Sequence, residues 1–129
     1  MEKALRLARN DEIRSIIYYN LAISHYYITN YDLALDYVQK AQEIKDGDDL
    51  HILSAEIFIK QKKQKEALKE YEELLKNDPD NINYAVNIAN IYLNEHNYIK
   101  ARNVLKTFIK KNPSQKNSPK LQSYGILVL

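Results

Sequence analysis

The sequence contains no cysteine and no tryptophan, and its 129 residues include two glycines and three prolines. Without cysteine the chain can form neither a disulfide nor a thiolate metal site, which fits a reducing compartment. With so few turn-forming residues a hairpin-rich β protein is disfavoured, because most hairpins need glycine, proline or a similar residue. The composition therefore favours an all-α fold.

Long apolar runs and a strong charge bias are also missing. The sequence has no apolar run of about 18 residues, the length that would suggest a membrane span. Its first residues, MEKALRLARNDE, alternate charged and apolar side chains and lack the apolar centre of a signal peptide. The 19 basic and 17 acidic residues leave a net charge of +2, without the basic footprint of a nucleic-acid binder. We therefore predict a cytoplasmic protein without membrane or nucleic-acid partners.

The chain contains an internal repeat. Ala34, Ala67 and Ala101 recur at a regular interval, and an apolar residue or tyrosine follows each of them four positions later. A further apolar residue lies seven positions after each anchor, and this spacing of four and three marks one face of a helix. Twelve positions before the anchors lie three more alanines on a second helical stripe: Ala22, Ala55 and Ala89. Each unit is therefore predicted to be a pair of helices that approach closely at small residues.

The interval between the anchors is about 34 residues, the length of a tetratricopeptide repeat. With its two helices, its small and aromatic positions and a closing Pro79 or Pro113, the unit resembles that family. The resemblance implies an all-α, right-handed α-solenoid of antiparallel helix pairs. We expect a single domain with a partial preceding helix at 1–14, repeats at 15–47, 48–81 and 82–117, and a capping helix or truncated fourth repeat at 118–129.

The sequence departs from the family pattern at three positions. His25 takes the place of an aromatic residue, Ser54 that of a leucine and Asp46 that of a closing proline. At the C-terminal end, the first-helix spacing returns at Leu121, Tyr124, Gly125 and Val128, after a predicted helix start at Ser118 and Pro119. Both ends are therefore expected to be cut within a repeat.

A column of asparagines follows the first helix of the third repeat: Asn83, Asn87, Asn90 and Asn94. They fall within about 60° of arc and extend over about 16 Å. The resemblance implies that this side faces a concave groove, where family members use asparagine to bond a peptide backbone. Asparagine both donates and accepts hydrogen bonds. The same column also fits a solvated helix face in an asparagine-rich chain, and the sequence leaves both interpretations open.

Further groove candidates come from the first helices of the other two repeats: Tyr19, Asn20, Ile23, Tyr26, Tyr27, Glu56 and Lys60. Tyrosine offers rigid contact area with a polar tip, which suits recognition surfaces. Glu56 and Lys60, four positions apart, equally fit a helix ion pair. Some family members bind carboxylates of a partner through cationic side chains at groove positions. In this chain the matching positions hold Tyr19, Ile23, Leu53, Asn83 and Asn87, none of which is a cation. A carboxylate-binding site of that kind is therefore not expected.

No catalytic, metal or cofactor site is expected. His25, His51 and His96 lie in three different repeats, without the spacing of a metal site or a catalytic triad. The sequence therefore predicts a non-catalytic module that binds an extended peptide or partner segment in its concave groove. Two alternatives remain: the sensor region of a larger bacterial regulatory protein, and a scaffold that forms homo-oligomers through its terminal helices.

Overall fold

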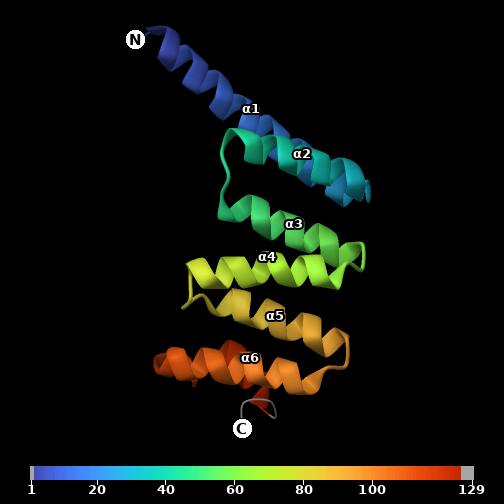
Figure 1. Ribbon diagram of the computed structural model, residues 1–129, viewed down its shortest axis with the longest axis vertical. Coiled ribbons are helices and arrows are strands. Elements are labelled where there is room, and N and C mark those ends of the chain that lie inside the picture. The colour runs from blue at the N-terminus through green and yellow to red at the C-terminus, as the bar shows by residue number, and fades with distance from the viewer. Residues whose placement is uncertain (1, 126–129) are drawn as a thin grey trace. The chain divides into compact units, whose positions relative to one another are not determined.

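The computed structural model describes residues 2–125, with side chains from residue 9 onwards, and this part of the chain contains helices and no strand. The helices, labelled in Figure 1, are α1 (Glu2–Tyr27), α2 (Tyr31–Ile44), α3 (Asp48–Lys60), α4 (Gln64–Asn77), α5 (Ile82–Asn94) and α6 (Tyr98–Lys111). A 3₁₀ turn, η1 (Pro113–Gln115), and a short helix, α7 (Pro119–Gln122), follow. The prediction of an all-α fold of paired helices is confirmed.

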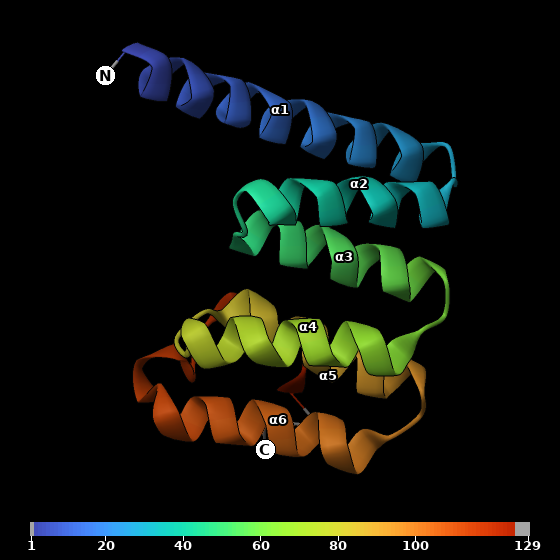
Figure 2. The same cartoon turned by 45° about the horizontal axis from the view of Figure 1, so that its top comes forward.

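The chain divides into two compact units, Met1–Ala67 and Leu68–Leu129, and the boundary lies within α4. In the first unit α1, α2 and α3 follow one another with alternating direction, as Figures 1 and 2 show. The second unit contains most of α4, then α5, α6, η1 and α7. Each unit has its own hydrophobic core.

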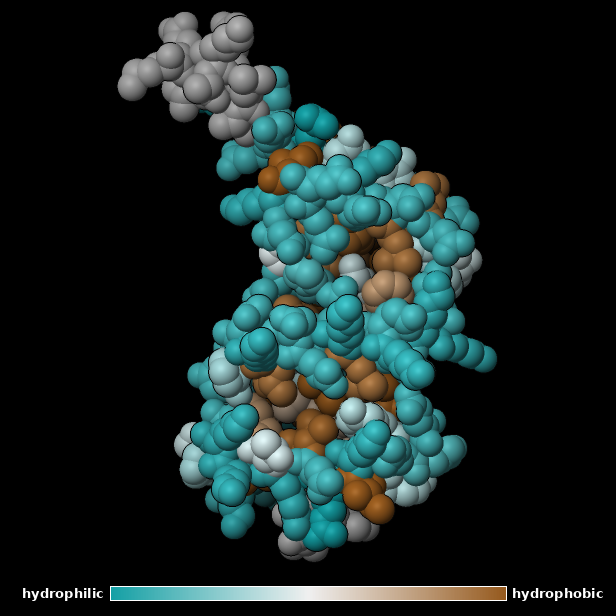
Figure 3. Space-filling view, in the orientation of Figure 1, coloured by the Kyte–Doolittle hydropathy of each residue, from teal (hydrophilic) through white to brown (hydrophobic). Residues whose placement is uncertain are grey.

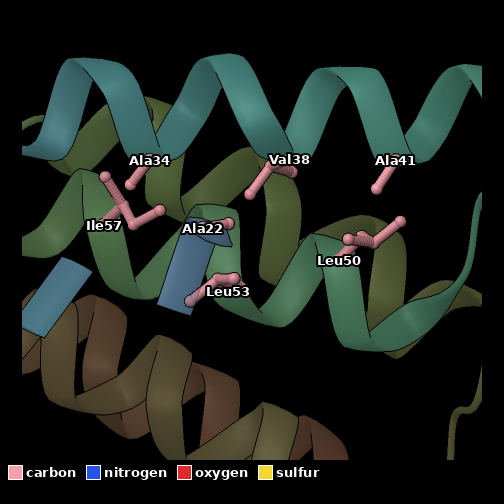
Figure 4. Close-up of a cluster of buried hydrophobic side chains, with 7 residues drawn as sticks. All are labelled: Ala22, Ala34, Val38, Ala41, Leu50, Leu53 and Ile57. Atoms are coloured by element: carbon pink, nitrogen blue, oxygen red, sulfur yellow. The ribbon is translucent and has the colours of Figure 1, made fainter. Parts of the chain in front are cut away.

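Small residues form the contact between helices in the first unit. Ala22 of α1 and Ala34 of α2 are completely buried. Because alanine carries only a methyl group, two helix backbones can approach closely where alanines meet, and larger side chains fill the space alongside. Figure 4 shows these alanines together with the other members of the core: Val38, Ala41, Leu50, Leu53 and Ile57.

The second unit repeats this arrangement. Ala89 of α5 and Ala101 of α6 are completely buried, as the predicted repeat requires. Leu105 and Phe108, four and seven positions after Ala101, pack in the same core. Leu121 of α7 is also completely buried there, so the C-terminal segment covers the end of this core.

The turn within each helix pair follows the same period as the alanines. Thr29, Lys62 and His96 occupy the corresponding position of the three turns and have positive φ angles of 66°, 61° and 60°. In each turn the next backbone N–H donates to the carbonyl five positions earlier, with an N···O distance of 2.8 Å. None of the three is glycine, the residue that reaches this conformation without a steric cost.

The ends of the chain differ from the prediction. We expected a separate helix before Ser15, but α1 continues from Glu2 to Tyr27 without a break. The segment Asn10–Arg14 contains neither glycine nor proline, so no local signal ends the helix there. The N-terminal part of α1 consequently extends beyond α2 (Figures 1 and 2).

The C-terminal helix begins at Pro119, as predicted, but ends at Gln122. The side chain of Ser118 makes no capping hydrogen bond. Leu121 and Tyr124 pack into the second core. The fourth member of the predicted stripe, Val128, lies outside the described residues.

Replacing Thr29 by glycine should stabilise the protein. A non-glycine residue in this conformation costs of the order of 1–3 kcal/mol, and the flexibility of glycine offsets about 0.5–1 kcal/mol of the gain. We expect the free energy of unfolding, measured by urea denaturation, to rise by about 0.5–2 kcal/mol. Thr107→Gly, in the exposed face of α6, is the control and should lower it by about 0.3 kcal/mol. A loss of stability in Thr29→Gly would contradict the account of the turn.

Candidate functional site

Two neighbouring stripes of aromatic residues run along α1. Tyr18 and His25 form the first stripe, and both rings stack on Tyr37 of α2, with centroid distances of 6.0 and 5.5 Å. This stripe is therefore used for packing within the helix pair. His25 occupies the expected aromatic position.

The second stripe consists of Tyr19, Ile23 and Tyr26, which are partly buried against the first core. These residues also line a cavity of about 230 Å³. Its walls come from α1 and α3: Tyr19, Ile23, Tyr26 and Tyr27 on one side, and Asp49, Ile52, Leu53 and Glu56 on the other. The second stripe thus contributes to the core and still presents atoms to an open space.

A neighbouring cavity of about 370 Å³ shares Tyr19 and Asp49 with the first. Its other lining residues come from α1 and from the segment that leads into α3: Ser15, Ile16, Lys45, Asp46, Gly47, Asp48 and Leu50. Because the two cavities share lining residues, we treat them as one surface and call it the tyrosine groove. The groove lies entirely within the first unit.

The tyrosine groove is an environment of negative charge and reduced hydration. Burial raises the pKa of the Glu56 carboxyl, and the nearby Lys60 offsets part of this rise. Burial also raises the pKa of the Tyr19 hydroxyl, and the carboxylates of Asp49 and Glu56 raise it further. For the pKa of Tyr26 burial again comes first, followed by the charge of Glu56. Both hydroxyls are therefore protonated near neutral pH and can donate hydrogen bonds.

Asp46 at the edge of the groove already has partners. Its carboxylate accepts hydrogen bonds from Nε2 of His51 at 2.8 Å and from the backbone N–H of Gly47 at 2.9 Å. Burial raises the pKa of Asp46, but these hydrogen bonds outweigh burial and leave the pKa below its usual value. Asp46 thus fixes the entry to α3, at the position where a closing proline was expected.

The structure brings together five of the seven candidates predicted in the first two repeats: Tyr19, Ile23, Tyr26, Tyr27 and Glu56. The other two lie outside the lining of the groove. Asn20 is exposed and its backbone carbonyl accepts a hydrogen bond from Oγ of Ser24, while Lys60 is exposed beyond Glu56.

Of the residues that line the cavity at Tyr26, sequence reasoning missed Asp49 and Ile52, and it predicted as site residues none of those that line only the neighbouring cavity. With Leu53 and Glu56, Asp49 and Ile52 form a stripe at spacings of three, four and seven on α3, which is the signal that could have identified them. Asp49 lies in the first turn of α3, where the helix dipole alone explains an acidic residue. Leu53 is buried in the core as well as lining the groove.

The asparagine column lies in the second unit, and two of its members contact the C-terminal segment. Oδ1 of Asn83 accepts a hydrogen bond from Nζ of Lys120. Oδ1 of Asn90 accepts one from the Tyr124 hydroxyl at 2.6 Å. Lys120 of α7 and Tyr124, which follows the C-cap of α7, therefore engage two of the four asparagines.

Asn87 and Asn94 remain available on the same face of α5. Asn87 is half-buried and Asn94 is exposed. Among residues 9–125 neither amide forms a side-chain hydrogen bond. The groove role predicted for the column therefore stays a prediction, and it now depends mainly on these two residues.

A separate cavity of about 520 Å³ lies in the second unit between α4 and α6. Ile88 and Tyr92 of α5 form part of its lining, and Figure 3 shows hydrophobic side chains in a hollow at this place. None of the predicted site residues lines it. The cavity has charges of both signs at its edge, from Glu72, Lys76 and Lys111.

Other kinds of site receive no support from the described residues. Within that part of the chain, no three histidine or acidic side chains are placed to hold a metal ion. None of its helices combines the length and apolar character needed to cross a membrane. Ile13, Ile16 and Ile17 are exposed on α1, but the predicted homo-oligomer through terminal helices stays a prediction.

The chain was compared with known families and proteins. Residues 52–81 match the family model described as tetratricopeptide repeat. A stretch of 55 residues is 47% identical to the Hsp70-Hsp90 organising protein of Plasmodium falciparum (isolate 3D7). This stretch is 43% of the present chain but 10% of the relative, so the chain corresponds to a small part of that protein.

Several solved structures have a similar fold. The MamA D159K mutant aligns over 88% of this chain and 65% of its own, with a TM-score of 0.59 and 21% sequence identity. MamA AMB-1 aligns over 88% of this chain and 66% of its own, with a TM-score of 0.57 and 21% identity. The match at 52–81 and the identity to the organising protein confirm the resemblance to the tetratricopeptide repeat family, and the likeness to the solved structures confirms the helical fold.

The contact between Asn90 and Tyr124 can be tested against a neighbouring asparagine. We expect Asn90→Ala to leave the protein about 0.5–1.5 kcal/mol less stable than Asn87→Ala, because only the first removes a hydrogen bond. Both changes gain the same helix propensity, so the difference in the free energy of unfolding isolates the contact. If the two variants are equally stable, the hydrogen bond between Asn90 and Tyr124 does not stabilise the fold, and Asn90 is available for binding like Asn87.

Proposed function

We propose that this tetratricopeptide repeat protein is a non-catalytic module that holds an extended segment of a partner protein in the tyrosine groove. The observation that supports the proposal is the convergence of Tyr19, Ile23, Tyr26, Tyr27 and Glu56 on one cavity. These residues were selected as candidates from their helical positions and from the groove that the family resemblance implies.

The chemistry of the groove suits recognition of a peptide. Tyr19 and Tyr26 pack on the hydrophobic core, so their rings are held in place before a partner arrives. A pre-formed surface binds without losing much conformational entropy on association. Each ring also offers apolar area and a hydroxyl that can bond a peptide backbone.

The groove consists of two adjoining cavities, an arrangement that suits successive side chains of an extended peptide. The cavity at Tyr26 measures about 230 Å³ and adjoins a second cavity along α1 and α3. Successive side chains of an extended segment could occupy the two.

The similarity to a known relative supports the proposal that the binding partner is a protein. The matched relative is named as an organising protein for Hsp70 and Hsp90. We propose from this likeness that the present chain likewise binds another protein. The second unit adds a further proposal, in which the amides of Asn87 and Asn94 bond the backbone of a partner segment. Each such bond would contribute about 0.5–1.5 kcal/mol.

A displayed library of random linear peptides, panned on the immobilised chain, tests the proposed function. We expect enriched peptides to bind the unchanged protein. Their affinity for the Tyr27→Ala variant should be about tenfold lower, because the variant lacks a large contact surface. Tyr27 is 76% exposed, so the variant should keep its fold.

The matched control is Tyr98→Ala, which removes a tyrosine that is 56% exposed and lies outside the groove. Affinity measured by isothermal titration calorimetry should stay within about twofold for this control. The proposal is lost if no peptide is enriched, or if Tyr27→Ala and Tyr98→Ala have the same effect.

A further inference from the structure

We propose that the tyrosine groove recognises a cationic segment, in which two lysine or arginine side chains lie three positions apart in the partner. This inference rests on the proposed function and names the chemistry of the partner. It is carried by the charge of the groove and by the spacing of its residues.

The charged residues that line the groove are mostly acidic. They comprise one lysine, Lys45, and four carboxylates: Asp46, Asp48, Asp49 and Glu56. Asp46 is already hydrogen-bonded to His51 and Gly47, which leaves three carboxylates to act on a ligand. A concave surface with apolar walls concentrates such a field and attracts the opposite charge.

Among the carboxylates of the groove, Glu56 is the strongest candidate for binding a cation. Glu56 is exposed on α3 and lines the cavity with Tyr19 and Tyr26, and partial burial of its carboxyl raises its pKa. The described residues form no ion pair between Glu56 and Lys60, although Lys60 lies one turn away. Acids at the start of a helix are explained by the helix dipole, which accounts for Asp48 and Asp49. Glu56 lies two turns further along α3, where that explanation no longer applies.

The carboxylates and tyrosines form two matching pairs across the groove. Tyr19 and Tyr26 lie seven positions apart on α1, and Asp49 and Glu56 lie seven positions apart on α3. The two helices run in the same direction (Figures 1 and 2). Tyr19 and Asp49 line both cavities, whereas Tyr26 and Glu56 line only the cavity of about 230 Å³, so the two pairs lie toward opposite ends of the groove. Residues seven positions apart are about 10.5 Å apart along a helix.

Each pair can hold one cation between a carboxylate and an aromatic ring. A lysine or arginine gains energy from the face of a tyrosine as well as from the opposite charge. The chain already uses this chemistry on the other stripe of α1. There the ammonium of Lys40 lies 5.8 Å from the ring centre of Tyr18 and 5.4 Å from that of Tyr37.

The distance between the pairs selects a spacing in the ligand. In a polyproline II helix every third residue points in the same direction, and one such repeat rises about 9.3 Å. This rise is close to the separation of about 10.5 Å between the two pairs. In a β-strand, side chains three positions apart point to opposite sides and could not reach both pairs.

Synthetic peptides with matched composition test the inference. The probe is acetyl-GPRPPRPG-amide, and its controls are the isomer with adjacent arginines, acetyl-GPPRRPPG-amide, and the probe with both arginines replaced by neutral citrulline. By titration calorimetry we expect the probe to bind about tenfold more tightly than either control, because each control loses at least one charged contact. Added salt should weaken the binding of the probe.

Glu56→Gln and Asp49→Asn should each reduce the affinity for the probe by about tenfold. Glu43→Gln removes the same charge from an exposed position on α2, outside the groove, and should change the affinity less than about twofold. Circular dichroism checks that the variants keep their helices. The inference is overturned if Glu56→Gln and Glu43→Gln have equal effects, or if the isomer binds as well as the probe.

The outcomes separate this inference from the proposed function. If the citrulline peptide binds as tightly as the probe and Tyr27→Ala weakens both, the groove binds peptides without regard to charge, and the cationic partner is excluded. If neither these peptides nor any from the displayed library bind, both proposals fail together.

Discussion

The contact between completely buried alanines is the constraint on which the structure depends. In the first unit Ala22 and Ala34 lie at the contact between α1 and α2, and in the second unit Ala89 and Ala101 have the corresponding place in α5 and α6. A larger side chain at these points would separate the helices, because the cores are close-packed. The regular period of the sequence thus follows from a packing requirement that each helix pair meets in the same way.

This contact also determines which face of α1 is available for binding. The helix cannot rotate while Ala22 stays against α2, so Tyr18 and His25 are directed to Tyr37. One residue further along the chain, Tyr19 and Tyr26 are directed to α3 and to the space beside it. The proposed recognition by the tyrosine groove therefore depends on a contact that is completely buried.

The sequence predicted those features that follow from local periodicity. The alanine positions, the helix pairs and the convergence of Tyr19, Ile23 and Tyr26 all depend on angular positions around a helix, which spacing determines. The continuity of α1 through Asn10–Arg14 was missed because a repeat boundary was placed where no residue ends a helix. Asp49 was missed because the helix dipole already explains an acidic residue at the start of α3.

Contacts between segments that are distant in the sequence could not be predicted, for a different reason. Asn90 and Tyr124 are far apart in the sequence, and their hydrogen bond depends on how α7 folds back onto α5. The angular position of Asn90 was predicted from spacing, but the segment that covers it could not be. An exposed polar column can therefore be recognised in a sequence, whereas its occupation by the chain itself requires the three-dimensional structure.

The most direct test of the account is the stability of Ala34→Leu. Overpacking at the contact between α1 and α2 should lower the free energy of unfolding by about 1–3 kcal/mol in urea denaturation. Gln39→Leu, at an exposed position of the same helix, adds a leucine without a packing conflict and should stay within about 0.5 kcal/mol of the unchanged protein. If Ala34→Leu is as stable as the unchanged protein, the alanine contact does not position α1, and the account of the groove fails with it.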